Sequence, residues 1–129
     1  MIVLDTHVLI WHLLDDPKLH PALRRSIIAE PVSILVPTIA IWETLLLAQK
    51  GRIEITATDP GAALRTWIRE SGFQETPLTG DIAVLSRTLP FEHDDPADRF
   101  IAATAHANGA ALATSDERLR RLKWLDFAY

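Results

Sequence analysis

The chain has 129 residues, 48% of them hydrophobic, which suits one domain with one core. It has no cysteine, which excludes disulfides, thiolate metal sites and cysteine nucleophiles and is compatible with a reducing cytoplasm. The net charge of −4, from 17 acidic and 13 basic residues, argues mildly against a nucleic-acid partner, although bound divalent cations would offset clustered carboxylates. We expect neither a signal peptide nor a membrane-spanning helix, because no basic segment precedes the first apolar run and polar residues interrupt the longer runs.

Apolar runs alternate with segments of helical periodicity along the chain. We predict strands at residues 1–4, 33–36, 73–78 and 110–114. We predict helices at residues 8–14, 21–30, 38–50, 60–71, 79–89 and 95–108, with a last short helix after residue 116. The alternation favours a single α/β domain over residues 1–129, with a mostly parallel sheet of about five strands and helices on both faces.

Two acids directly follow predicted strands. Asp5 ends the apolar run at the start of the chain, and Asp116 comes just after residues 110–114. Ligands bind at the carboxyl ends of strands in open α/β sheets, so both acids are candidate metal ligands. Each also has a local explanation, because Asp5 or Thr6 could cap the following helix and Ser115 could cap the last one. For Asp5 alone, the sequence supports the metal-ligand and the helix-cap interpretations about equally.

Two further acids lie in predicted helices. Glu43 sits in a nearly all-apolar segment, where a buried carboxylate needs a partner or a metal because its desolvation costs on the order of several kcal/mol. The alternative is an exposed glutamate near Lys50. Asp98 lies in the first turn of a helix that Asp95 caps and Pro96 begins, where the helix dipole favours an ionised carboxylate. The alternative is a capping box formed with Asp95.

The four acids share a predicted position at one edge of the sheet. Helix capping can explain three of these acids individually. It does not explain why all four should lie at the same edge of the sheet. Their conjunction favours a divalent-metal site, and a metal site suggests hydrolysis. The acids are Asp5, Glu43, Asp98 and Asp116.

The order and spacing of four short motifs resemble the PIN-domain nucleases over nearly the full chain. The motifs are Asp5-Thr6-His7, Trp42-Glu43, His93-Asp94-Asp95-Pro96-Ala97-Asp98-Arg99 and Thr114-Ser115-Asp116. The size and the HxDPxDR-type box are more narrowly similar to the VapC-type toxins of bacterial toxin–antitoxin pairs. Relatives often have Ser at the position of Ala40 and Lys at that of Leu47, which puts contacts of those side chains in doubt but removes no proposed metal ligand.

The resemblance implies a Rossmann-like sheet, a Mg²⁺- or Mn²⁺-dependent ribonuclease acting on RNA, a homodimer, and inhibition by a small cognate antitoxin. By match of position, the metal-site acids would be Asp5, Glu43, Asp98 and Asp116. Residues expected to orient these acids are Thr6, Thr114, Asp95 and Arg99. Candidates for contacts to substrate phosphates are Arg118, Arg120 and Arg121, which could equally lie on a solvated helix face.

The chemistry follows from ligands that are all oxygens. Carboxylates without cysteine or paired histidine ligands select Mg²⁺ or Mn²⁺ over zinc. We hypothesise that Asp5, Asp98 and Glu43 hold the main ion and that Asp116 completes the site or positions water, with the number of ions left open. Arg99 is expected to pair with a neighbouring acid rather than with phosphate. His93 is expected to pack in its loop.

The sequence argues against three other functions. A phospho-accepting receiver module needs a lysine at the end of a late strand, and Lys123 comes too late. A phosphatase with Asp5 as nucleophile needs a second acid two positions on, where the chain has His7. A catalytically inert partner-binding domain is disfavoured by the presence of all four acids. The tryptophans, expected in the core or in a dimer interface, are Trp11, Trp42, Trp67 and Trp124.

Overall fold

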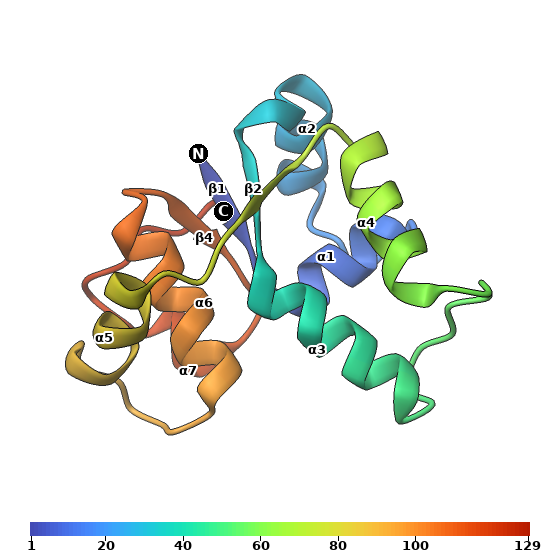
Figure 1. Cartoon of the computed structure of the whole chain (residues 1–129). Coiled ribbons are helices and arrows are strands. Elements are labelled where there is room, and N and C mark those ends of the chain that lie inside the picture. The colour runs from blue at the N-terminus through green and yellow to red at the C-terminus, as the bar shows by residue number, and fades with distance from the viewer.

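The computed structural model describes residues 1–129 and contains one parallel sheet of four strands in the order β3-β2-β1-β4 (Figure 1). The strands are β1 (Ile2–Leu4), β2 (Ile34–Pro37), β3 (Gln74–Thr76) and β4 (Ala111–Ala113). The expectation of about five strands is one too high. The place beside β4 holds only an isolated parallel bridge between Leu112 and Phe127, so the C-terminal segment extends the sheet without forming a strand.

The helices cover both faces of this sheet. They are α1 (Thr6–Leu13), α2 (Pro21–Ala29), α3 (Thr38–Gln49), α4 (Pro60–Glu70), α5 (Gly80–Thr88), α6 (Pro96–Ala107) and α7 (Glu117–Arg120), with a short 3-10 helix η1 (Pro31–Ser33). The first helix begins at Thr6, earlier than predicted, because the Asp5 side chain caps it. Ser33 belongs to η1 rather than to β2, since Pro31 starts a tight turn there.

Alternate residues of β1, β2 and β4 face two separate cores. Leu4 packs in a cluster with side chains of α1, α2 and α4, whereas its neighbour Val3 packs against α6, Leu119 of α7 and the C-terminal segment. In Figure 1 α1, α2 and α4 lie on one side of the sheet, and α5, α6 and α7 lie on the other. A helix layer on each side explains why the strands read as continuous apolar runs.

Two tryptophans do not fill the core. Trp42 on α3 is 55% exposed and Trp67 on α4 is 37% exposed, whereas Trp11 and Trp124 pack against the two core clusters.

None of the helices combines the length and the apolar character needed to cross a lipid bilayer.

The chain reverses its direction of winding at β1. From β1 it moves to β2 on one side and later returns to β4 on the other. The carboxyl ends of β1 and β4 consequently lie at the topological switch point of the sheet, the place where open parallel sheets bind ligands. Asp5 follows β1, and Thr114 follows β4.

Candidate active site

Asp5 is buried at the end of β1 and both of its carboxylate oxygens are engaged. Its backbone N–H donates to Ala113 O, which continues the pairing of β1 with β4. Asp5 Oδ1 accepts a 2.7 Å hydrogen bond from Thr6 N, and Oδ2 accepts a 2.6 Å bond from the Thr114 hydroxyl. Burial raises the pKa of Asp5 in spite of these two bonds, which act in the opposite direction. Asp5 is therefore both a helix cap and a buried acid at the strand end.

Asp116 is positioned through the same threonine. The Asp116 backbone N–H donates to Thr114 Oγ1 at 3.0 Å, while its Oδ1 accepts from Arg118 N at 2.8 Å and Leu119 N at 3.1 Å. Asp116 itself, not Ser115, is thus the N-cap of α7. One hydroxyl group therefore links the two acids that follow neighbouring strands.

Asp98 has no capping role for its carboxylate. Asp95 Oδ1 accepts from Asp98 N at 3.0 Å, but the return bond of a capping box is missing, because Asp95 N instead donates to His93 Nδ1 at 3.4 Å. The Asp98 side chain is only 14% exposed. Burial first, and then the charges of Asp5, Asp95, Asp116 and Glu43, raise the pKa of Asp98 to about 7.

The electrostatic coupling at Asp98 is what unites the four predicted acids. Asp5 comes from the end of β1, Asp116 from the turn after β4, and Glu43 from α3, yet each charge acts on the Asp98 carboxyl group. Glu43 is half-buried on α3, a helix that packs against both α1 and α6, and its carboxylate has no hydrogen bond or ion pair with a side chain. Glu43 is thus neither fully buried nor paired with another side chain.

Arg118 and Arg120 have different environments. Arg118 Nη2 lies 3.6 Å from Asp116 Oδ2 and 4.0 Å from Asp98 Oδ2. Arg120 donates to Thr114 O and Tyr129 O and lies over the rings of Phe127 and Tyr129. Of the two, only Arg118 faces the acids.

Arg121 and Arg99 are paired outside the acidic cluster. Arg121 is held by Glu92, 3.0 Å away. Arg99 is buried, and it donates to Ser86 O, His93 O and Asp94 Oδ1. The acid that pairs with Arg99 is thus Asp94, as part of the loop before α6, and not one of the four predicted metal ligands.

The donor set suits a hard divalent cation, although the side chains are not arranged as a ready-made ligand group. No three acidic or histidine side chains of residues 1–129 lie close enough together to hold an ion as they stand. The only two buried side-chain polar atoms without a partner, Thr6 Oγ1 and His93 Nε2, belong to residues beside Asp5 and Asp98. The four acids offer only oxygen donors, the ligands that a hard ion such as Mg²⁺ or Mn²⁺ prefers.

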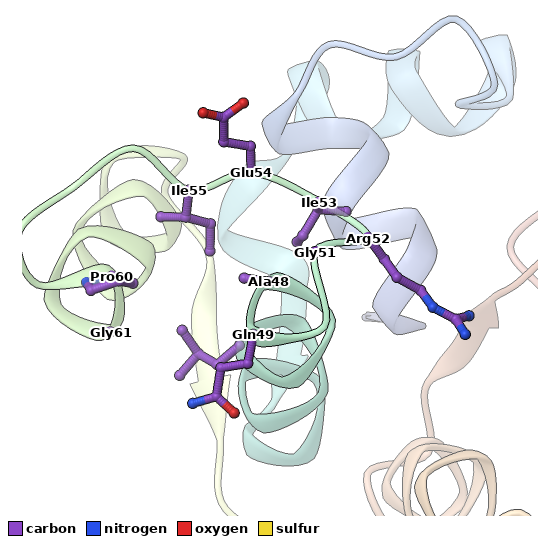
Figure 2. A pocket seen from close by; sticks show the side chains of 10 residues that line it. Ala48, Gln49, Gly51, Arg52, Ile53, Glu54, Ile55, Pro60 and Gly61 are labelled. Carbon is purple, nitrogen blue, oxygen red and sulfur yellow. The ribbon is translucent and has the colours of Figure 1, made fainter.

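A large cavity lies elsewhere. It has a volume of about 840 Å³ and opens between the carboxyl end of α3, the loop after it and the start of α4. Figure 2 shows Arg52 and Glu54 at its rim with their charged groups pointing away from each other. None of the four acids lines this cavity.

Comparison with known proteins identifies the fold family. A family model described as PIN domain matches residues 2–125. The chain belongs to the PIN-domain family. This PIN domain is 30% identical over 122 residues to Ribonuclease VapC22 of Mycobacterium tuberculosis, covering 92% of this chain and 89% of that relative. The family predicted from the four motifs is confirmed.

Solved structures share the fold of this PIN domain. A toxin–antitoxin complex from Klebsiella pneumoniae contains a chain with a TM-score of 0.69 at 20% identity, covering 100% of this chain and 98% of that chain. VapBC2 from Rickettsia felis bound to a DNA fragment from their promoter gives a TM-score of 0.68 at 18% identity, covering 98% of this chain and 97% of that one. At such identities the likeness establishes the architecture.

Two contacts near the site are not indicated by the sequence motifs. His93 is 10% exposed in its loop, and its Nε2 in addition lies 3.9 Å from Asp98 Oδ2; its place two residues before the Asp95 cap is the only signal in the sequence. Arg120 Nη1 and the Tyr129 hydroxyl donate to Thr114 O. No local pattern in the sequence indicates that contact, because the C-terminal segment reaches Thr114 only in the folded chain.

Proposed function

We propose that this PIN domain is a divalent-metal-dependent endoribonuclease and the toxin of a toxin–antitoxin pair. The observation that carries the proposal is the Asp98 carboxyl group, whose pKa is raised to about 7 by burial and by the charges of the other acids. Ribonuclease VapC22 supports the reaction class, at 30% identity over 92% of the chain. Carboxylates held together against their mutual repulsion gain stability when a cation binds, which is the expected state of the working enzyme.

Each acid has a proposed role. Asp5, Asp98 and Glu43 would hold Mg²⁺ or Mn²⁺, and Asp116 would complete the site or orient the attacking water. The bound ion would supply a more acidic water and stabilise negative charge on the leaving oxygen of the phosphodiester. The number of ions stays open.

The surrounding residues would keep the acids in place. Thr6 N and the Thr114 hydroxyl fix the Asp5 carboxylate, and Asp95 fixes the backbone of Asp98. Arg118, exposed and adjacent to Asp98 and Asp116, is the best placed of the three predicted arginines to contact a phosphate. Arg120 and Arg121 are engaged with the C-terminal segment and with Glu92.

Cleavage of RNA by the purified chain tests this function. The protein is incubated with mixed RNA and either Mg²⁺ or Mn²⁺, beside Asp5→Ala and Asp98→Asn variants and an EDTA control. We expect cleavage only by the unmodified chain with metal present. Equal cleavage in all four samples would show that the RNase activity comes from another source.

The partners follow from the relatives and are tested separately. The solved structures of similar fold include toxin–antitoxin complexes, which supports a small antitoxin as the partner of this chain. The homodimer is the assembly that the family resemblance implies. Sedimentation at micromolar concentration should give twice the chain mass, and a monomer would count against the dimer.

The rival functions receive less support from the structure. A receiver module needs a lysine at the carboxyl end of a strand, and Lys123 lies beyond α7. An inert binding domain has no need for a buried, charge-coupled acid such as Asp98. Labelling of the chain by a small phosphodonor would revive the first alternative.

A further inference from the structure

His93 has an unusual environment for a residue in a loop. Its side chain is 10% exposed, and its Nε2 is buried without a hydrogen-bond partner. A buried N–H group left unpaired is costly, so such an atom calls for an explanation. The nearest carboxylate oxygen is Asp98 Oδ2, at 3.9 Å from Nε2, roughly 1 Å beyond hydrogen-bond length.

The loop around His93 fixes which ring nitrogen carries the proton. Asp95 N donates to His93 Nδ1 at 3.4 Å, so Nδ1 acts as the acceptor and the hydrogen of the neutral ring belongs on Nε2. Arg99 donates to the His93 carbonyl oxygen at 3.2 Å and to Ser86 O at 2.7 Å, which ties the loop to α5. The ring is therefore held with a donor facing Asp98.

An arginine lies near the same oxygen. Arg118 Nη2 lies 4.0 Å from Asp98 Oδ2, and the Arg118 side chain is about half exposed. Neither neighbour is within hydrogen-bond distance, and neither oxygen of the Asp98 carboxylate accepts a hydrogen bond. Asp5, in contrast, is held by two bonds of 2.7 and 2.6 Å.

We propose that His93 is a positioning residue, whose Nε2–H donates a hydrogen bond to Asp98 Oδ2 and directs the remaining lone pairs of that carboxylate toward the cation. This inference rests on the proposed function, because it assigns a partner to one of its metal ligands. A side-chain rotation of Asp98 that shortens the 3.9 Å separation would satisfy the buried Nε2–H and orient Asp98 at the same time. Such partners of ligating groups commonly set metal affinity.

Metal binding to the full chain, measured by calorimetry with Mn²⁺ alone, tests the inference. His93→Phe keeps the buried ring but removes the donor, and His93→Gln restores an N–H donor at similar reach. We expect His93→Phe to weaken Mn²⁺ binding by about 10- to 100-fold, and His93→Gln to recover most of the affinity. His106→Phe, the same substitution at an exposed position of α6, should bind as the unmodified chain does.

A magnetic resonance measurement covers the case in which the variants do not fold. The ring nitrogens of His93 in the ¹⁵N-labelled unmodified chain should show the Nε2-protonated neutral form, with the Nε2–H resonance moving downfield when Mg²⁺ is added. Protonation on Nδ1, or an Nε2–H signal indifferent to Mg²⁺, would overturn the proposal.

The outcomes separate this inference from the proposed function. If the unmodified chain and folded His93→Phe bind Mn²⁺ equally, His93 has no positioning role while the metal-dependent function stands. If His93→Gln is as weak as His93→Phe, the ring shape matters rather than the donor, and the inference fails. If the unmodified chain binds no Mn²⁺, the metal site itself fails and the inference fails with it.

Discussion

The Thr114 hydroxyl donates a 2.6 Å hydrogen bond to Asp5 Oδ2, although 109 residues separate the two along the chain. The bond joins the carboxyl ends of β1 and β4, the neighbouring strands at which the chain reverses its direction of winding. The same hydroxyl accepts from Asp116 N, so it sets the positions of two acids at once. Thr114 is fully buried, and its carbonyl is held in turn by Arg120 and Tyr129.

Replacing Thr114 with valine should therefore destabilise the fold. Valine keeps the shape but removes the hydroxyl, leaving Asp5 Oδ2 and Asp116 N without their partner. We expect Thr114→Val to lower the free energy of unfolding by about 1 to 3 kcal/mol in urea titrations, and Thr114→Ser to recover part of the loss. Thr88→Val, on an exposed face of α5, should change it far less; equal stability of Thr114→Val and the unmodified chain would contradict the prediction.

Because of the Asp98 carboxyl group, the free energy of unfolding measured without metal should fall as pH rises. Its pKa is about 7 in the folded chain against an ordinary value of 3.8, so between these values the folded state binds more protons than the unfolded state. Stability contributed by the protonated form is present below the lower value and is lost as pH rises through about 7. Above that pH the ionised, buried carboxylate destabilises the fold.

An Asp98→Asn variant removes this penalty. With EDTA at pH 8 we expect it to unfold at higher urea concentration than the unmodified chain, by roughly 1 kcal/mol or more, and the difference to shrink near pH 4. Asp81→Asn is the matched control, because Asp81 also lies in the first turn of a helix but is exposed. Lower stability of Asp98→Asn at pH 8 would contradict the coupling of the acids.

Arg118 supplies positive charge next to Asp98 and Asp116 at 4.0 and 3.6 Å. Removing that charge should tighten Mn²⁺ binding a few-fold in the absence of RNA, since the cation and Arg118 act on the same carboxylates. The Arg118→Gln variant should also bind RNA with a salt dependence reduced by about 0.7 in log–log slope, as expected for one lost phosphate contact. If the salt dependence of RNA binding changes in Arg121→Gln but not in Arg118→Gln, the phosphate contact is made by Arg121 and the prediction for Arg118 is wrong.

Arg120 was predicted to contact phosphate, but its contacts in the structure are internal. Two hydrogen bonds, to Thr114 O at 3.0 Å and to Tyr129 O at 2.8 Å, tie the C-terminal segment to the end of β4. We expect Arg120→Gln to lower the free energy of unfolding by roughly 1 to 3 kcal/mol while leaving RNA affinity unchanged in the folded protein. Arg25→Gln, at an exposed position of α2, serves as control; weaker RNA binding by folded Arg120→Gln at full stability would restore the phosphate assignment.

The sequence alone determined the alternation of strands and helices and the family. Apolar strand runs, a proline after an aspartate cap and the glycines that end helices are local signals, and the structure forms its elements within a few residues of them. The strand count was one too high because the last pairing, Leu112 with Phe127, depends on where the C-terminal segment packs and not on its own composition.

Only the tertiary structure decided what each polar residue near the acids does. The sequence left Asp5 evenly divided between a helix cap and a buried acid, and the fold makes it both by bringing Thr114 to its second oxygen. It likewise separates Arg118 at the acids from Arg120 at the C-terminus, and it turns His93 toward Asp98. Strand and helix signals act over a few residues, whereas these assignments depend on contacts between segments up to 109 residues apart.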